Sequence, residues 1–167
     1  MIADAEDSAY RMGAMTPPDI EMIIQRVMTR VRSVDALRYL CHGVERRLHM
    51  LDYCLQRIAH ETPPAGSEPL TPDKAAMLAV YLNAFYINVR GTLDNLAWVL
   101  YHELKLNEER PSVTESKKQS IGLSSKSFLC ALESKSSSWS KCASTLASDD
   151  KKNWFKTIAD KRDPAAH

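Results

Sequence analysis

Glycine and phenylalanine are scarce in this chain, which has only 5 glycines and 3 phenylalanines among its 167 residues. Leucine, alanine, methionine, arginine and lysine are common instead, and residues of this kind lose little rotamer freedom in a helix. The 44% share of hydrophobic residues suits one globular domain of this length. We therefore expect an all-α protein with a single buried core.

Other features are missing, and each absence argues against a class of protein. The four cysteines show no Cys-x-x-Cys spacing and no histidine at zinc-ligand intervals, so neither a disulfide framework nor a zinc knuckle is expected. The first seven residues hold three acids and no basic residue, unlike a secretory signal, and no apolar run approaches the ~20 residues that cross a membrane. A Gly-rich phosphate loop is absent too. We expect a cytoplasmic protein with no cofactor and no membrane partner.

Positive charge is concentrated in one stretch, although the formal net charge is only +1. Between residues 26 and 57 the acids are Asp35, Glu45 and Asp52. The arginines of the same stretch are Arg26, Arg30, Arg32, Arg38, Arg46, Arg47 and Arg57. This local excess permits an anionic partner.

The first helix is predicted by Thr16-Pro17-Pro18-Asp19, in which a capping residue precedes a proline at a position that needs no amide hydrogen. It should run to about Val31. Residues 1–15 lack clear periodicity and should form a flexible N-terminal tail.

A long amphipathic helix should follow, starting at Ser33 or Asp35 and ending at the proline-rich loop 62–69, which can reverse the chain. Its apolar residues recur at intervals of three and four, as on one face of a helix. The expected buried seam consists of Val34, Leu37, Cys41, Val44, Leu48, Leu51, Leu55 and Ile58.

Thr71-Pro72-Asp73 repeats the capping signal and predicts a second long helix, antiparallel to the first, to about Leu104. Together the two helices should form the base of a helical bundle. Gly91 stands mid-helix, where glycine costs roughly 1 kcal/mol relative to alanine, so we expect a kink or the close approach of a neighbouring helix there. Arg90 and Asp94 are one turn apart, and a helix salt bridge is the ordinary interpretation of this pair.

Residues 107–148 are rich in serine and lysine and poor in apolar residues, which predicts a partly disordered insertion within a single domain spanning residues 16–167. The lysines of this region line a nucleic-acid path in one interpretation and form a solvated loop in the other. They are Lys117, Lys118, Lys126, Lys135 and Lys141.

The last helix should begin at Ser148-Asp149-Asp150 and end near Arg162, with charges that complement its dipole. The closing segment Arg162-Asp163-Pro164-Ala165-Ala166-His167 has the most specific chemistry of the chain. Histidine can take a proton near neutral pH, and a guanidinium can bind two phosphate oxygens at once. A helix that began at Pro164 would direct its free N–H groups to the same point. Arg162 and His167 are therefore candidates for metal-independent RNA cleavage.

A bundle with two long antiparallel helices followed by Arg-x4-His resembles the HEPN superfamily of nucleotide-binding and ribonuclease domains, which includes toxin, phage-defence and CRISPR-associated ribonucleases. The resemblance covers roughly residues 35–167 in architecture and 162–167 in motif. It implies Arg162 and His167 as catalytic residues, with Asp163 as the polar residue that orients them. It also implies a homodimer with a composite active site, RNA as the substrate, and an antitoxin or regulatory protein as a further partner.

Other residues are assigned around this motif. Lys156 and Lys161, on the last helix, are expected to contact RNA, and Arg90 and Asp94 to support the catalytic residues. In the family a further helix follows the histidine, whereas this sequence ends at His167. If His167 were the true terminus, its free α-carboxylate would raise the pKa of the imidazole and repel a phosphate. In the alternative, the sequence is part of a longer chain whose further helix would complete the core.

A metal site is the weaker alternative. It would use side chains that flank the seams of the two long helices, and helix-surface charges are usually solvated, so no metal is expected. The side chains are His42, Glu45, His49, Asp52, Asp94, His102 and Glu103. Two functions are left: an endoribonuclease that cleaves single-stranded RNA by attack of the 2′-hydroxyl group, or a non-catalytic helical module that binds a protein or a nucleotide.

Overall fold

The structure, a computed structural model, describes residues 17–62 and 69–162, and these form helices and no strands. The predicted tail, residues 1–15, lies outside the described residues. The elements are α2 (Pro17–Met28), α3 (Val34–Arg38), the π-helical segment η1 (Tyr39–Glu45), α4 (Arg46–Glu61), α5 (Pro72–Glu103), α6 (Leu106–Glu109), the 3-10 segment η2 (Glu115–Ser120), α7 (Lys126–Glu133), α8 (Ser137–Leu146) and α9 (Asp149–Arg162).

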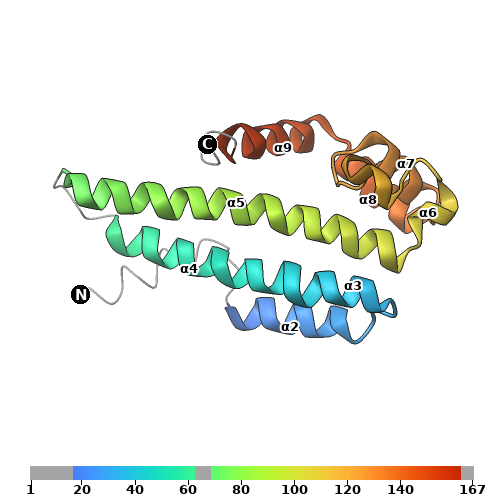
Figure 1. The fold of residues 1–167 in the computed structure, drawn as a ribbon, viewed down its shortest axis with the longest axis horizontal. Coiled ribbons are helices and arrows are strands. Elements are labelled where there is room, and N and C mark those ends of the chain that lie inside the picture. Colours follow the sequence, from blue (N-terminus) through green and yellow to red (C-terminus); the bar gives the residue numbers. More distant parts are fainter. Residues whose placement is uncertain (1–16, 63–68, 163–167) are drawn as a thin grey trace.

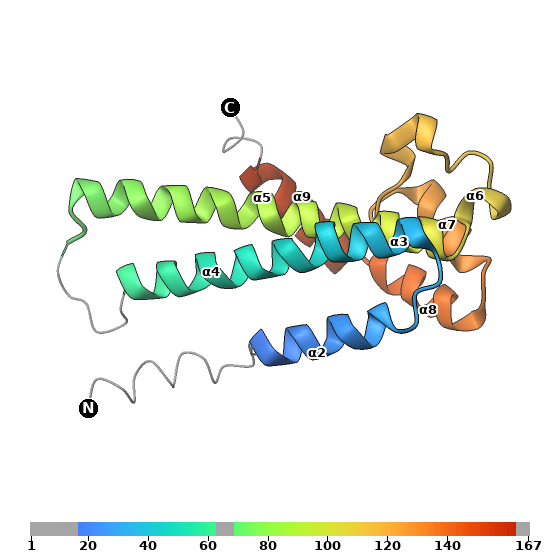
Figure 2. The same ribbon diagram turned by 60° about the horizontal axis from the view of Figure 1, so that its bottom comes forward.

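Helix α5 is the centre of the fold (Figure 1). Segments α3, η1 and α4 continue one into the next and run antiparallel to α5 along one side, with α2 outside them (Figures 1 and 2). Helix α9 packs against the other side of α5, and α6, α7 and α8 gather at the C-terminal end of α5 (Figure 2). The prediction of an all-α protein with two long helices packed together is confirmed.

Capping side chains fix the starts of the long helices. The Ser33 and Thr71 hydroxyls accept hydrogen bonds from the N–H three residues later, at 3.2 and 3.4 Å, as the sequence predicts. A second cap comes from the last residue of α5, because the Glu103 carboxylate accepts from the N–H of Ser33 at 2.9 Å and from that of Arg32 at 3.0 and 3.1 Å. These bonds satisfy backbone donors near the helix start and tie the start of α3 to the end of α5.

The buried seam of the first long helix differs from the predicted one. Val34 is 76% exposed and Leu55 is 50% exposed, whereas Ala36 and Leu40, which lie outside the predicted seam, are buried; Val44 is buried as predicted. The cause is η1, because a π-helix closes each hydrogen bond over five residues and not four. Residues exactly four apart then share one side, so a pattern of threes and fours assigns the wrong face in this stretch.

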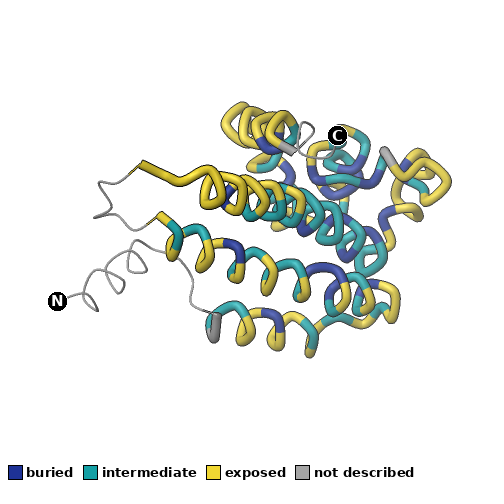
Figure 3. Tube along the Cα trace, turned by 60° about the vertical axis from the view of Figure 1, so that its left-hand side comes forward, coloured by how far each residue is buried: buried dark blue, intermediate teal, exposed yellow. Residues whose placement is uncertain are grey.

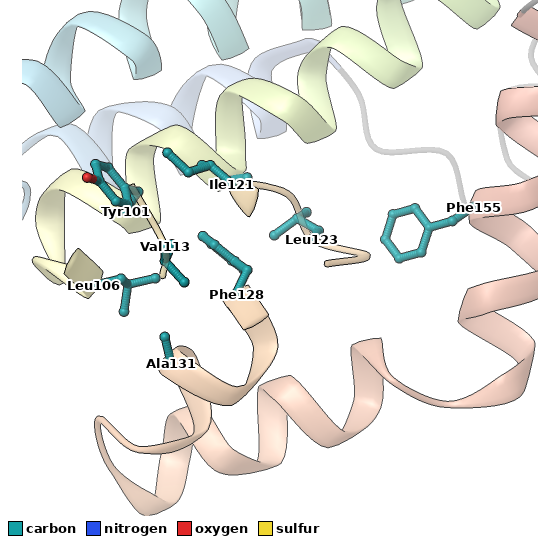
Figure 4. Close-up of a cluster of buried hydrophobic side chains, with 9 residues drawn as sticks. Tyr101, Leu106, Val113, Ile121, Leu123, Phe128, Ala131 and Phe155 are labelled. Carbon is teal, nitrogen blue, oxygen red and sulfur yellow. The ribbon is translucent and has the colours of Figure 1, made fainter. Parts of the chain in front are cut away.

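Buried side chains form two clusters on two sides of α5. The smaller cluster joins α3 and η1 to α5 and consists of Ala36, Leu40, Val44 and Val99. The larger cluster joins α5 to the segments that follow it in the chain (Figure 4). It consists of Ala97, Tyr101, Leu106, Val113, Ile121, Leu123, Phe128, Ala131 and Phe155. Helix α5 therefore supplies core residues to both layers.

Residues 107–148, for which the sequence predicts a partly disordered insertion, contain η2, α7 and α8 and contribute to the larger cluster. Val113 and Phe128 are completely buried there. Few apolar side chains are present, but they converge on the C-terminal half of α5. Burial of these few large side chains offsets the entropy of ordering a polar segment.

The two halves of α5 are covered unevenly (Figure 3). In residues 71–83 Leu78 is buried and Tyr81 is half-buried, and the other side chains are exposed. In residues 92–101, by contrast, every side chain is at least half-buried. Packing therefore encloses the C-terminal half of α5, while the N-terminal half contacts mainly α4.

The second cap of α3 predicts a loss of stability when its acceptor is removed. Glu103→Ala leaves backbone donors of Arg32 and Ser33 without this acceptor, and we expect the free energy of unfolding to fall by about 1–2 kcal/mol. Urea denaturation followed by circular dichroism measures the change. Glu133→Ala removes an exposed carboxylate at the end of α7 and should change the same quantity by less than about 0.5 kcal/mol. Equal losses in the two variants would contradict the capping role.

Candidate functional site

Part of the predicted catalytic segment lies at the end of the last helix. Helix α9 ends at Arg162, as the sequence predicts. The Arg162 side chain, Asp163 and His167 lie outside the described residues. Lys156 and Lys161, the expected RNA contacts, are exposed on α9. The catalytic assignment therefore stays a prediction.

Arg90 and Asp94 form an ion pair on α5, with 3.3 Å between Arg90 Nε and Asp94 Oδ1. The interpretation of the pair as a helix salt bridge is confirmed. With side chains that are 28% and 46% exposed, such a pair contributes at most about 1 kcal/mol. The two residues also line a pocket of about 430 Å³ with Trp98 and Lys118. Their support of a ribonuclease site stays a prediction.

A different group of polar side chains surrounds a pocket of about 500 Å³ between η1 and α5. We call it the basic pocket and define it by Arg38, His42, Arg46, Arg47, Asn95 and His102. Tyr39, Gly43 and the exposed carboxylates Asp35 and Glu115 line it as well. Among the described residues, no carboxylate forms an ion pair with any of the three arginines. The pocket therefore carries an excess of positive charge.

Arg47 is the most firmly held cation of the basic pocket. Its guanidinium lies directly against Gly91 of α5, and its Nη1 donates a hydrogen bond to Asn88 Oδ1 at 3.2 Å. Its Nε is buried and has no hydrogen-bond partner among the described residues. An unpaired buried donor costs about 1–3 kcal/mol, and a guanidinium has five N–H donors in a rigid fork. Packing thus holds a cation in place while satisfying few of its donors.

Two glycines allow the close approach of η1 and α4 to α5. A Cβ at Gly43 would overlap the Asn95 side chain, and a Cβ at Gly91 would overlap the Arg47 guanidinium. Asn95 is held in turn by donation from Nδ2 to the Gly91 carbonyl at 2.8 Å. The prediction that a close approach accounts for Gly91 is confirmed.

The π-helical segment η1 positions the basic side chains. Arg38, His42 and Arg46 stand four residues apart, just before η1, within it and just after it. Because a turn of π-helix holds more than four residues, this spacing keeps them on one side. Such turns occur frequently at functional sites. The sequence signal for this group is the arginine excess of residues 26–57, which sequence reasoning noted without locating a site.

Aromatic rings lie beside these cations. Tyr39 stacks on Trp98, with ring centroids 5.2 Å apart and an interplanar angle of 9°, and on His102, at 5.5 Å and 17°. Trp98 and His102 are one turn apart on α5, with centroids 5.7 Å apart. Stacking in such a group fixes ring orientation and adds to the burial of its members. Tyr39 and His102 therefore enter the pocket wall as oriented rings.

Three of the side chains weighed as metal ligands have other places in the structure. Glu103 caps α3, and His42 and His102 line the basic pocket. The part of the chain that the structure describes contains no group of three or more His, Cys, Asp or Glu residues placed to hold a metal. Burial raises the pKa of the Cys41 and Cys54 thiols, which disfavours the reactive thiolate.

The contact between Arg47 and Gly91 predicts that the effect of Gly91→Ala on the free energy of unfolding has opposite signs in the presence and in the absence of the Arg47 side chain. A glycine-to-alanine change in a helix interior normally stabilises by roughly 1 kcal/mol. Gly91→Ala should instead lower the free energy of unfolding, because the new methyl group displaces the Arg47 guanidinium. In an Arg47→Ala background the same change should stabilise the protein, and chemical denaturation of the four proteins measures the coupling.

The matched control is Gly122→Ala, since no atom lies within 4 Å of a Cβ at that position. Its effect should be the same with and without Arg47. Stabilisation by Gly91→Ala in both backgrounds would contradict the close approach of Arg47.

Comparison of the chain with family models, with curated proteins and with solved structures found no match. The likeness to the HEPN superfamily therefore depends on the architecture and the closing motif alone. Among the described helices, none combines the length and the apolar composition needed to cross a membrane.

Proposed function

We propose that the protein is a helical module that binds a phosphate-bearing ligand, a nucleotide in the first instance, in the basic pocket. The observation that carries the proposal is the convergence of Arg38, Arg46 and Arg47 on one pocket without carboxylate partners among the described residues. Two of them flank η1, and the third is fixed against α5. All three lie on the continuous segment α3–η1–α4, and the contact of Arg47 with α5 favours a site built by the fold over a run of surface charge.

The chemistry of the pocket suits phosphate in particular. Guanidinium groups bind phosphate oxygens through paired, charge-assisted hydrogen bonds, and the three arginines of the pocket outnumber its two carboxylates, Asp35 and Glu115. Asn95 and the two histidines add uncharged or titratable donors. A volume of about 500 Å³ lies within the range of small-ligand pockets. The pocket therefore has both the charge and the space for a phosphorylated small molecule.

Calorimetric titration with ribose 5-phosphate and adenosine monophosphate tests the proposal, because both ligands carry the same phosphate. We expect binding that weakens as ionic strength rises. Arg46→Ala should weaken it about tenfold, which corresponds to about 1.4 kcal/mol. Arg57→Ala is the matched control, since Arg57 lies on the same helix but contacts Tyr53 and not the pocket. No binding of either ligand, or equal losses in both variants, would reject the proposal.

A second candidate is the metal-independent endoribonuclease of HEPN type, which we propose on the basis of the closing motif. It is supported by the long pair α4 and α5 and by the end of α9 at Arg162. In this proposal Arg162 and His167 cleave single-stranded RNA, Asp163 orients them, and two copies meet in a cytoplasmic homodimer. An antitoxin or a regulatory protein would control such an activity.

Cleavage of single-stranded RNA in the presence of a chelator tests the second candidate. Wild-type protein should produce fragments that end in a 2′,3′-cyclic phosphate. Arg162→Ala and His167→Ala should each reduce the rate at least about a hundredfold, as expected for loss of an acid–base or charge-stabilising group. The Lys152→Ala control, on the same helix, should stay near the wild-type rate. Equal rates in all four proteins would rule out catalysis by this motif.

A further inference from the structure

Tyr39 and His102 line the basic pocket, and Trp98 stacks on both of them. Tyr39, Trp98 and His102 have nearly parallel rings with centroids between 5.2 and 5.7 Å apart. If Trp98 and His102 lay on opposite faces of Tyr39, their centroids would be at least about 7 Å apart, twice the ~3.5 Å contact distance of carbon atoms. They are closer than that, so both lie on the same face of Tyr39. Neither ring covers the opposite face.

Tyr39 is within reach of a ligand. Its side chain is half-buried and lines the basic pocket together with the arginines. It follows Arg38 directly in the sequence and stands seven residues before Arg46, which is less than about 10 Å along the axis because η1 is wound more tightly than the 1.5 Å rise of an α-helix. This separation is comparable to that between the base and the phosphate of a nucleotide. The pocket thus presents an oriented ring at one end and a guanidinium at the other.

We propose that Tyr39 is the platform on which the base of a nucleotide stacks while its phosphate binds Arg46 and Arg47. This inference rests on the phosphate-binding function proposed above and assigns its specificity to one residue. Every base offers a π-face, so stacking on an aromatic side chain tolerates any base and adds affinity that a sugar phosphate lacks. Trp98 and His102 support the platform from behind and set its angle.

The comparison of adenosine monophosphate with ribose 5-phosphate isolates the base, because the two ligands differ at the anomeric carbon, where adenine replaces a hydroxyl group. Wild-type protein should bind adenosine monophosphate at least about tenfold more tightly. Tyr39→Leu, which keeps an apolar side chain next to the smaller core cluster, should abolish this difference and leave the affinity for ribose 5-phosphate within about twofold of wild type. Tyr39→Phe keeps the ring and should retain the difference.

A spectroscopic measurement on the wild-type protein keeps the test independent of how the variants fold. Stacking on the ring should shift the proton resonances of bound adenine upfield, and the Tyr39→Phe protein should show the same shift. A tenfold preference that survives in folded Tyr39→Leu, or bound adenine without an upfield shift, would overturn the platform.

The outcomes also separate this inference from the function that it builds on. Equal binding of the two phosphates by wild-type protein, with loss of both in Arg46→Ala, would reject stacking on Tyr39 and keep the phosphate site. Failure of the wild-type protein to bind either phosphate would reject the site and the platform together.

Discussion

The packing of one guanidinium, with its Nε buried, between two long helices sets the geometry of this protein. Arg47 lies where only a glycine on α5 leaves room, so α4 and α5 have one favourable register. A second close contact, between Gly43 and Asn95, fixes the same register one turn away. Such polar contacts are unfavourable unless packing enforces them. The two apolar clusters on either side of α5 supply that packing, and the basic pocket is its result.

Local signals in the sequence predict much of the helical framework. Thr71 caps the helix that it was expected to cap, and of the two expected starts of the first long helix, Ser33 and Asp35, Ser33 provides the cap. Of the two explanations expected for Gly91, a kink and a close approach, the structure shows the close approach. The seam was assigned wrongly around η1, because a period of 3.6 residues does not apply to a π-helical turn. The packing of residues 107–148 against α5 was not assigned from the sequence either. It depends on the surface that α5 offers, which is tertiary information.

The basic pocket could be predicted only in part, because its formation also depends on tertiary contacts. An excess of arginine between residues 26 and 57 is plain in the sequence, but it does not say which side chains converge. Arg57 bonds Tyr53 on its own helix, at 3.1 Å, whereas Arg46 and Arg47 line the pocket. Which arginines line the pocket depends on the turn geometry of η1 and on Asn95 of α5, about fifty residues away. The closing motif, by contrast, could be named from spacing and chemistry alone.

The uneven cover of α5 divides one continuous helix into two regions of different local stability. Segments with few buried apolar contacts open at little cost in free energy, whereas enclosed segments open only when the whole domain unfolds. The first turns of α5 belong to the former kind and residues 92–101 to the latter. Asn95 and His102 stand in or directly after the enclosed part. Fraying at the far end of the hairpin can therefore proceed while the side chains of α5 that line the basic pocket keep their positions.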